Sequence, residues 1–371
     1  MKDKIKVHLQ YPWKFPDSPY YKYLINSPPK NIKYQNIKIQ KGVITNKRFF
    51  WFSNFLKRNI RKSTRILFPS LPNAHLSQKK DYHLIHCAHC LSKNKDVPWV
   101  ADVEYSSQLW IAGSTPKDKT KVIKILLRKN CKKIISWTKL MEKELLNKFP
   151  EIKNKLITIY PGVPVLSTNK KHQDINLLFS ARYFFQKGGY HALEVIDRLT
   201  KKYQNVNGFI ISPNIPKGIK KKYEKNKKIR IFDIMPQEKL IKHFYSITDI
   251  FIYPGYGDSF GFSIPEVMGI GIPIVSVDTK SRKEIITNGK TGYIIENSFT
   301  QPELIKLSYT INDERSKKLI NLIEKKTLKL IENVSLRKKM AKNSKIEIKE
   351  GKFSIKKQRK LIEKIYIEAI E

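Results

Sequence analysis

Short apolar runs alternate with amphipathic segments along the second half of the chain. Each run is almost continuously apolar, as expected for a strand buried on both faces, and the segments between the runs have the spacing of helices. This alternation predicts a doubly wound α/β domain with a parallel sheet. The expected strands lie at 175–182, 206–213, 228–233, 247–255, 272–278 and 292–296, and the expected helices lie near 189–204, 236–246 and 264–270.

The first half repeats the pattern less regularly, and a polar stretch at 167–174 separates it from the second half. We therefore expect an N-terminal domain at 1–166, a C-terminal domain at 167–345 and a terminal segment at 346–371 that contains an amphipathic helix. Doubly wound units bind ligands at the carboxyl ends of their strands, so two such units predict a cleft between them. The expected strands of the first half lie at 4–10, 82–88, 99–105, 132–138 and 155–162.

The net charge of the chain indicates the kind of partner that it binds. The 371 residues include 73 Lys and Arg against 32 Asp and Glu, which gives a formal net charge of +41. The first 100 residues carry 20 basic and 4 acidic side chains. Such a surplus indicates an anionic partner, whether a phosphorylated substrate, a lipid headgroup surface or nucleic acid. The alternative is a compositional bias in which most of the lysines are simply solvated.

Several classes of protein are not expected from this sequence. No run of about 18 uncharged apolar residues predicts a membrane-spanning helix, and the N-terminal residues have no apolar core of a secretory signal. The three cysteines, Cys87, Cys90 and Cys131, are too few for a disulfide framework and favour a reducing compartment. We therefore expect a cytoplasmic protein.

The stretch 254–275 carries the most specific chemistry, because it places a glycine-rich loop between an expected strand and an expected helix. Gly257 and Gly261 allow backbone N–H groups to approach a ligand closely. The N-terminus of the helix favours anions such as a diphosphate. Asp258 in the loop and Glu266 in the first helical turn can accept hydrogen bonds from sugar or ribose hydroxyls.

A second stretch, 179–196, ends an expected strand with Arg182 and places Lys187 before two glycines at an expected helix start. Two cations at the carboxyl end of a strand can clamp a diphosphate. Both stretches also have structural alternatives. The second is compatible with an exposed turn in a lysine-rich chain, and in the first Ser263 and Glu266 have the spacing of a capping box.

Together these stretches resemble the C-terminal domain of the retaining glycosyltransferases of family 4, which have the GT-B fold. The order of motifs is Arg-x4-Lys-Gly-Gly after a strand, then Asp-x7-Glu, then Gly-x-Pro-Ile-Val, then a turn at 284–292. The resemblance covers about 130–300, including the end of the family's N-terminal domain. It implies an α/β protein of two Rossmann-like domains facing a cleft, with a terminal helix that contains Tyr366 and returns to the first domain.

The resemblance implies a role for each matching residue. Arg182 and Lys187 would hold the donor diphosphate, Glu266 would bind the ribose, and residues 233–235 would flank the base. Asp258 stands where the family usually has Glu and would contact the donor sugar. Backbone groups of Gly261, Phe262 and Ser263 would line the sugar and phosphate.

Catalysis would then fall to Asp258, Arg182 and Lys187. The two cations and the helix N-terminus would stabilise the charge on the leaving diphosphate, so no metal and no other cofactor is expected. The family's retaining step is described as needing no covalent protein nucleophile, and the donor phosphate itself would help to deprotonate the acceptor. No catalytic base is assigned for that reason.

The segment 83–90 of the first half gathers histidines and cysteines. Its Cys-x2-Cys spacing would suit zinc, but no second ligand pair exists elsewhere in the chain, so we expect no metal here. We expect instead a strand end beside the acceptor, with His86, His89 and Glu104 as acceptor-side residues. Relatives in the family often carry a His after the next strand, where this chain has Asp102 and Glu104.

The segment 49–68 has the residue pattern of a basic amphipathic helix. We expect its apolar face to pack on its own sheet while its basic face is solvated. The alternative is a helix at a membrane interface, where it would meet anionic lipid or a polyprenyl-phosphate-type acceptor. The apolar face consists of Phe52, Leu56, Ile60 and Leu67, and the basic face of Lys57, Arg58, Arg61, Lys62 and Arg65.

The sequence thus predicts a glycosyltransferase of the hexosyltransferase type that moves a sugar from a nucleotide-sugar donor to an acceptor hydroxyl with retention, in glycan or glycolipid biosynthesis. Its expected partners are the donor, a glycan or lipid-linked acceptor, and an anionic membrane surface at which it would be peripheral. No specific nucleic acid is expected. Two alternatives stay open: a nucleotide-sugar epimerase of the same fold, and a basic nucleic-acid-binding protein, for which no recognition motif is present.

Overall fold

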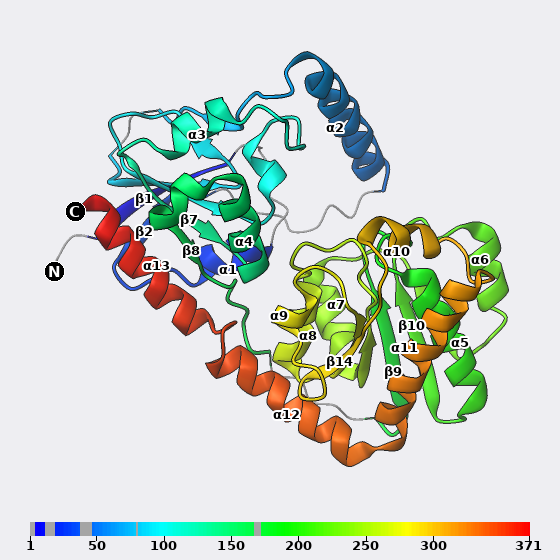
Figure 1. The fold of residues 1–371 in the computed structure, drawn as a ribbon. Coiled ribbons are helices and arrows are strands. Elements are labelled where there is room, and N and C mark those ends of the chain that lie inside the picture. Colours follow the sequence, from blue (N-terminus) through cyan, green and yellow to red (C-terminus); the bar gives the residue numbers. More distant parts are fainter. Residues whose placement is uncertain (1–3, 12–18, 38–46, 79–80, 167–171) are drawn as a thin grey trace. The chain divides into compact units, whose positions relative to one another are not determined.

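The computed structural model describes residues 4–11, 19–37, 47–78, 81–166 and 172–371. Within 47–57, the side chains it describes are those of Phe52, Phe55 and Leu56. The chain forms two compact units, which Figure 1 colours along the sequence. The first unit consists of Met1–Gly162 and Lys352–Glu371, and the second is Val163–Gly351.

A six-stranded parallel sheet forms the centre of the first unit, in the order β2-β1-β4-β6-β7-β8. The direction of strand order reverses between β1 and β4. The strands β4 and β6 are buried along their whole length, as expected for a parallel sheet covered on both faces. The strands are β1 (Ile5–Gln10), β2 (Ile32–Gln35), β4 (Leu84–Ala88), β6 (Trp99–Val103), β7 (Cys131–Ser136) and β8 (Leu156–Thr158).

All five strands expected in the first half are present, and β2 is an addition. It is only four residues long, and its buried residues alternate with more exposed ones, so it lacks the continuous burial of β4 and β6. A separate parallel pair is formed by β3 (Ala74–His75) and β5 (Leu91–Ser92).

The second unit has a six-stranded parallel sheet in the order β11-β10-β9-β12-β13-β14. This is the 3-2-1-4-5-6 order of a Rossmann fold, and the strand order reverses between β9 and β12. All six expected strands are present, and all but the edge strand β11 are buried along most of their length. They are β9 (Ile175–Ser180), β10 (Val206–Ile211), β11 (Ile229–Phe232), β12 (Ile250–Ile252), β13 (Ile274–Val277) and β14 (Gly292–Ile295).

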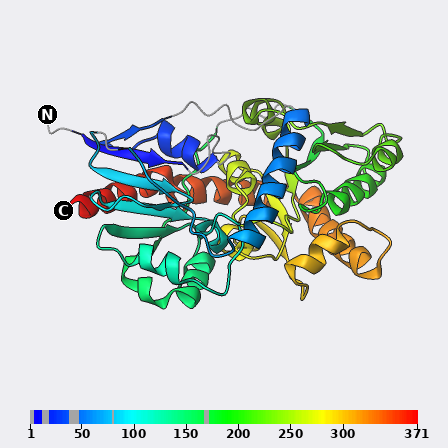
Figure 2. The same ribbon diagram turned by 90° about the horizontal axis from the view of Figure 1, so that it is seen from above.

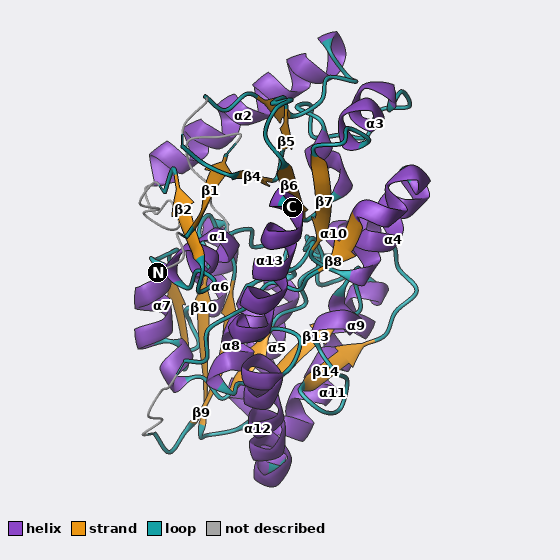
Figure 3. Cartoon of the chain, turned by 90° about the vertical axis from the view of Figure 1, so that its left-hand side faces the viewer, coloured by secondary structure: helices purple, strands orange, loops and turns teal. Residues whose placement is uncertain are grey.

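Helices surround the strands of each unit (Figure 3). In the second unit the long helix α11 packs on α5, and α12 packs on α8. Side chains cap several of these helices: Asp313 accepts from the Arg315 amide at the start of α11, and Asn333 accepts from the Leu336 amide at the start of α12. The helices are α5 (Gly189–Lys202), α6 (Lys217–Tyr223), α7 (Gln237–His243), α8 (Ser263–Ile270), α9 (Arg282–Ile285), α10 (Gln301–Leu307), α11 (Glu314–Glu332) and α12 (Val334–Glu350).

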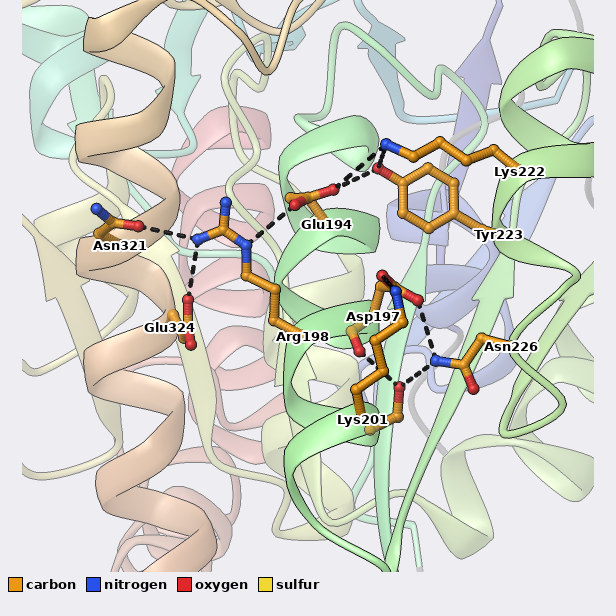
Figure 4. A network of polar contacts seen from close by, with 10 residues as sticks. Glu194, Asp197, Arg198, Lys201, Lys222, Tyr223, Asn226, Asn321 and Glu324 are labelled. Carbon is orange, nitrogen blue, oxygen red and sulfur yellow. Dashed lines mark hydrogen bonds and ion pairs between the residues drawn. The ribbon is translucent and has the colours of Figure 1, made fainter.

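A polar network joins α5 to α6 and α11 (Figure 4). Arg198 donates to Glu194 within α5 (3.0 Å) and to Asn321 (3.0 Å) and Glu324 (3.2 Å) on α11. Tyr223 at the end of α6 donates to Glu194. These contacts are partly solvated, so they fix the relative placement of the helices more than they stabilise the unit.

The first unit is completed by helices from both ends of the chain. The terminal helix α13 packs on β4 and β7, and Figure 2 shows it in red beside the strands of this unit. The helix α12 ends at Glu350 and α13 begins at Ile355. The terminal segment expected at 346–371 therefore contains the end of α12 and all of α13. The helices are α1 (Pro19–Asn26), α2 (Lys47–Leu67), α3 (Thr120–Leu126), α4 (Lys139–Lys148) and α13 (Ile355–Ile370), with short 3-10 helices at Ser106–Leu109 and Pro150–Lys155.

The helix α2 does not bury its apolar face, which contradicts the packing that we expected from its pattern. Phe52 is 58% exposed, and Leu56, Ile60 and Leu67 are also exposed. Basic residues from Arg58 to Arg65 are exposed as well, so α2 presents apolar and basic side chains together. The amphipathic spacing correctly predicted a helix, but the apolar face of this helix does not pack on the sheet. Among the described residues, no helix has the length and apolar character needed to cross a membrane.

Candidate donor site

Two loops meet at the carboxyl edge of the second sheet, where the strand order reverses. The first loop follows β9 and carries Arg182, which is partly buried, and Lys187. The second follows β12 and carries Asp258. The strands β9 and β12 are neighbours in the sheet, so motifs far apart in the sequence come together here. Open α/β sheets bind their ligands at this position.

Backbone hydrogen bonds join the two loops. The Gly255 amide donates to the Lys187 carbonyl (3.0 Å), and the Gly257 amide donates to the Gln186 carbonyl (2.9 Å). A Cβ atom on Gly257 would lie 2.4 Å from Cγ of Gln186. Gly257 therefore permits the close contact between the loops, and its amide is engaged there rather than directed at a ligand as we expected.

Two cations hold the carboxylate of Asp258. The Lys187 ammonium group pairs with Oδ1 and also donates to the Gly257 carbonyl (3.0 Å). On the other side, Nη2 of Arg282 donates to Oδ2 (3.2 Å) and to the Gly255 carbonyl (3.1 Å). Arg282 was not among the residues expected from the sequence. It occurs in a run of basic residues that is indistinguishable from a solvated surface segment, but it is buried.

The residue Asp258 is 8% exposed, and this burial works against ionisation of its carboxyl group. The charges of Lys187 and Arg282 and the hydrogen bond from Lys187 outweigh the burial, so the pKa of Asp258 is held below its usual range. Asp258 is therefore a carboxylate at neutral pH. It can accept a hydrogen bond from a hydroxyl group.

Tyr256 anchors the second loop to the body of the unit. Its buried hydroxyl lies 2.6 Å from Nδ1 of His191 on α5, and Nε2 of the same ring lies 3.0 Å from the Leu307 carbonyl. Burial lowers the pKa of His191, so the ring is neutral, with Nε2 donating to the carbonyl and Nδ1 accepting from Tyr256. Gln301 also donates to the Tyr256 carbonyl (2.9 Å). Residues of α5 and α10 thus hold the loop at Tyr256.

The helix α8 places Glu266 beside α7. It begins at Ser263 with Phe262 as its N-cap and no capping side chain, so the capping box that Ser263 and Glu266 could have formed is not present. Instead, Nε2 of Gln237 donates to Oε1 of Glu266 (2.6 Å), and Glu266 is 4% exposed. Gln237 was not predicted. It directly follows the loop containing residues 233–235, so that loop and Glu266 lie close together.

Gly261, Phe262 and Ser263 connect the acidic loop to α8. Gly261 has a φ of +80°, which favours glycine, and a Cβ atom there would lie 2.8 Å from Oδ2 of Asp258. The Phe262 ring packs on Phe260, with ring centroids 4.8 Å apart. The structure thus brings Lys187 of the first motif into contact with Asp258 of the second, with Gly261 beside Asp258.

In the first unit, His86 lies within β4 and is completely buried. Its Nε2 atom lies 2.6 Å from Oδ2 of Asp102, and its Nδ1 atom is hydrogen-bonded to the Tyr366 hydroxyl on α13. Asp102 also accepts from Tyr20 (3.1 Å) and Tyr21 (3.2 Å). His86 thus belongs to a buried network that ties the terminal helix to the sheet, which differs from the acceptor-side position that we expected.

His89 and Glu104 lie at the carboxyl edge of the first sheet, after β4 and β6. His89 has a φ of +56°, which is uncommon for a residue other than glycine, and its ring contacts Tyr21 and Trp137 with centroids 5.2 and 4.9 Å away. Within the described part of the chain, its Nδ1 atom has no hydrogen-bond partner. Burial lowers the pKa of His89 to about 4, so the ring is neutral at pH 7.

The cysteines of the segment 83–90 face the core. Nε2 of Gln10 lies 3.5 Å from the Sγ atoms of both Cys87 and Cys90. These two thiols and Cys131 are buried and free. Among the residues that the structure describes, no group of three or more His, Cys, Asp or Glu side chains could hold a metal ion.

The chain is similar to two curated proteins over part of their length. It is 28% identical over 91 residues to the capsular polysaccharide biosynthesis glycosyltransferase CapM of Staphylococcus aureus, a match that covers 23% of this chain and 24% of CapM. It is 25% identical over 229 residues to a probable sucrose-phosphate synthase of Thermosipho melanesiensis, covering 51% of this chain and 52% of that protein. The chain therefore spans about a quarter and about half of the length of these relatives.

The fold is that of known glycosyltransferase structures. The HepE protein of Anabaena, crystallised in complex with UDP, superposes with a TM-score of 0.60 at 12% identity, covering 98% of this chain and 100% of that one. Two Rossmann-like units with parallel sheets confirm the predicted GT-B fold. Residues 166–346 match the family model of the glycosyl transferases group 1, which spans the whole donor-site region. The domain at residues 166–346 therefore matches the group 1 glycosyl transferases.

Proposed function

We propose that this protein transfers a sugar from a nucleotide-sugar donor to an acceptor hydroxyl, in the assembly of a glycan or glycolipid. The observation that carries this proposal is the convergence of Lys187, Asp258 and Glu266 at the strand-order reversal of the second sheet. The family match over the same residues supports it, as does the similarity to a capsular polysaccharide glycosyltransferase and to a protein that binds UDP.

The roles follow from the chemistry of each group. The Arg182 guanidinium and the Lys187 ammonium would bind the donor diphosphate, assisted by the N-terminus of α8 with the backbone of residues 261–263. The Glu266 carboxylate, which already accepts from the Gln237 amide, would accept from the ribose hydroxyls. The Asp258 carboxylate would accept from a hydroxyl of the donor sugar.

In the transfer step, the bond between the anomeric carbon and the diphosphate oxygen breaks, and the acceptor oxygen bonds to the same carbon. The acceptor proton leaves with the diphosphate. Negative charge grows on the leaving diphosphate, and the two cations bound to it stabilise that charge. We propose retention of configuration, in line with the family resemblance, and we assign no covalent nucleophile and no metal or other cofactor.

We place the acceptor at the carboxyl edge of the first sheet, beside His89 and Glu104. The strand order of this sheet reverses between β1 and β4, and His89 directly follows β4. A neutral imidazole ring can donate one hydrogen bond to a sugar hydroxyl or accept one from it. His86 has no such role in this proposal, because both of its ring nitrogens are engaged within the core.

A panel of sugar nucleotides, offered with and without a pool of glycan and lipid-linked acceptors, tests the activity. We expect release of a nucleoside diphosphate from one class of donor, stimulated by the acceptor. Conversion of the sugar nucleotide into its epimer without release would identify an epimerase instead. Tight binding of DNA or RNA with a steep salt dependence, and no turnover of any donor, would favour the nucleic-acid alternative.

We also propose that the protein binds peripherally to an anionic membrane through α2. The helix exposes large apolar side chains, Phe52, Leu56 and Leu67 among them, together with its basic residues. This combination suits the boundary between lipid headgroups and acyl chains. An acceptor carried on a lipid would then be presented at the same surface.

Vesicle sedimentation tests this membrane proposal. The wild type should co-sediment at low salt with vesicles containing 30–40% anionic lipid, at roughly 1 kcal/mol per basic residue near the surface. Charge reversal of Arg58, Arg61, Lys62 and Arg65 should abolish the effect, whereas reversal of Lys220 and Lys221 on α6 should not. Absence of the wild type from the pellet at low salt would refute the proposal.

A further inference from the structure

Arg282, the first residue of the short helix α9, is almost completely buried, at 2% exposure. Its Nη2 atom donates to the Gly255 carbonyl (3.1 Å) and to Oδ2 of Asp258 (3.2 Å). Its guanidinium carbon lies 5.6 Å from the centre of the Tyr253 ring. All three contacts are with one loop, 253–258, so the guanidinium is fixed beneath that loop.

Two glycines make room for this ion pair. A Cβ atom on Gly255 would lie 2.3 Å from Nη2 of Arg282, and a Cβ atom on Gly261 would lie 2.8 Å from Oδ2 of Asp258. Both glycines also have a positive φ, of +66° and +80°, which other residues rarely adopt. The glycine-rich loop is therefore shaped around the pair formed by Arg282 and Asp258.

Stability alone is a poor reason for a guanidinium at this position. Among the residues that the structure describes, Nε and Nη1 of Arg282 have no hydrogen-bond partner. Buried N–H groups without a partner cost free energy, and an apolar side chain can often replace a buried ion pair without loss of stability. The presence of Arg282 therefore favours a role in the site.

Lys187 and Arg282 differ in their freedom to move. The Lys187 side chain is 14% exposed, on a flexible stem, whereas that of Arg282 is 2% exposed and held by the loop. Under the proposed function, the Lys187 ammonium group binds the donor diphosphate. When it turns to the phosphate, Oδ1 of Asp258 becomes available to a sugar hydroxyl, and the buried carboxylate loses one of its two counter-charges.

We infer that Arg282 is a positioning residue for the donor sugar, a role that rests on the proposed function. It holds Asp258 in place and keeps it ionised while Lys187 leaves Asp258 for the diphosphate. Recognition of the sugar then depends on Arg282, although Arg282 contacts no substrate. Recognition of the nucleoside diphosphate, which lacks the sugar, does not.

The test compares two ligands in four variants. Arg282→Met removes the charge at similar length, Arg282→Lys keeps it, and Asp258→Asn removes the partner. Arg198→Met is a matched control, because Arg198 also bridges carboxylates in the second unit but lies outside the site. Calorimetry gives the Kd for the nucleoside diphosphate, and steady-state kinetics give kcat/KM for the donor.

We expect Arg282→Met to lower donor kcat/KM about 10- to 100-fold, while the Kd for the nucleoside diphosphate changes by less than about threefold. Arg282→Lys should recover part of the loss, and Arg198→Met should leave both values close to wild type. In an Asp258→Asn background, Arg282→Met should have little further effect. The acid limb of the kcat/KM profile should move to higher pH in Arg282→Met, because burial then raises the pKa of Asp258 with less opposition.

Wild-type donor kcat/KM in folded Arg282→Met would overturn the positioning role, and so would an equal loss of affinity for donor and nucleoside diphosphate. If Arg282→Met does not fold, the double variant with Asp258→Asn, which removes both charges, and Arg282→Lys allow the same comparisons. If the wild type turns over the donor and Arg282→Met has the same kcat/KM, only the positioning role is rejected. A wild type that binds no nucleotide and turns over no donor rejects the proposed function, and this role with it.

Discussion

Gln237 donates a hydrogen bond of 2.6 Å to the Glu266 carboxylate, which joins the start of α7 to the first turn of α8. Both residues follow strands of the second sheet on its carboxyl side, and Glu266 is 4% exposed. In the proposed function, this carboxylate also accepts a hydrogen bond from a ribose hydroxyl.

Glu266→Gln should therefore weaken nucleoside diphosphate binding by about tenfold, because an amide is a weaker acceptor for the ribose and for Gln237. It should have little effect on stability, since the capping box is not formed. Glu303→Ala is the control: Glu303 does complete a capping box with Thr300, so its loss should cost about 0.5–1 kcal/mol of stability and leave affinity unchanged. Calorimetry and thermal unfolding separate the two effects. Unchanged affinity in Glu266→Gln would remove this residue from the site.

Lys187→Ala should reduce donor kcat/KM about 10- to 100-fold, because one of the two cations for the diphosphate is lost. It should also raise the pKa of Asp258, since Lys187 is the first of the two charges that counter its burial. The matched control is Lys201→Ala, which removes a lysine paired with Asp197 on α5 away from the site. Equal kinetics in the two variants would contradict the assignment of Lys187.

Tyr366→Phe should destabilise the first unit by about 1–3 kcal/mol, because the buried Nδ1 atom of His86 loses its partner. All five tryptophans of the chain lie in this unit, so fluorescence during urea unfolding reports on it directly. Tyr309→Phe, which removes an exposed hydroxyl in the second unit, should change nothing measurable. A Tyr366→Phe protein as stable as wild type would show that the network does not hold α13.

His89 should make the first unit sensitive to acid. Burial lowers its pKa to about 4, below the value of about 6.5 in an unfolded chain. Between these values the unfolded state binds more protons than the folded state, so stability is lost as the pH falls from about 6.5 towards 4. His89→Asn, which tolerates the positive φ, should flatten this loss by on the order of 1–2 kcal/mol. Parallel pH profiles for the two proteins would indicate that the ring is solvated.

The sequence predicted the second unit better than the first for a physical reason. Its central strands are buried on both faces, so most of them are nearly continuous apolar runs, and glycines mark several of the turns at their ends. The strand β2 has alternating burial and no such run. The packing expected for the helix α2 was wrong, because amphipathic spacing identifies a helix but does not identify the surface that covers its apolar face.

The candidate site was predicted where residues are close in sequence and missed where they meet only in space. Lys187 and Asp258 belong to recognisable motifs, and their contact follows from the adjacency of β9 and β12. Gln237 follows β11 and Arg282 follows β13, and no local sequence pattern distinguishes either of them from a surface residue. His86 illustrates the opposite case, because its partner Tyr366 lies 280 positions away, and spacing along β4 cannot show that both ring nitrogens are engaged.

The most direct measurement of the central claim is titration calorimetry of wild type and Asp258→Asn with nucleoside diphosphates and with the corresponding sugar nucleotides. One nucleoside diphosphate should bind wild type at one site per chain with a Kd of roughly 1–100 μM. Asp258→Asn should bind this nucleoside diphosphate as wild type does but bind the sugar nucleotide about tenfold more weakly. No binding of any nucleotide at about 1 mM, or equal weakening of both ligands by Asp258→Asn, would contradict the donor site.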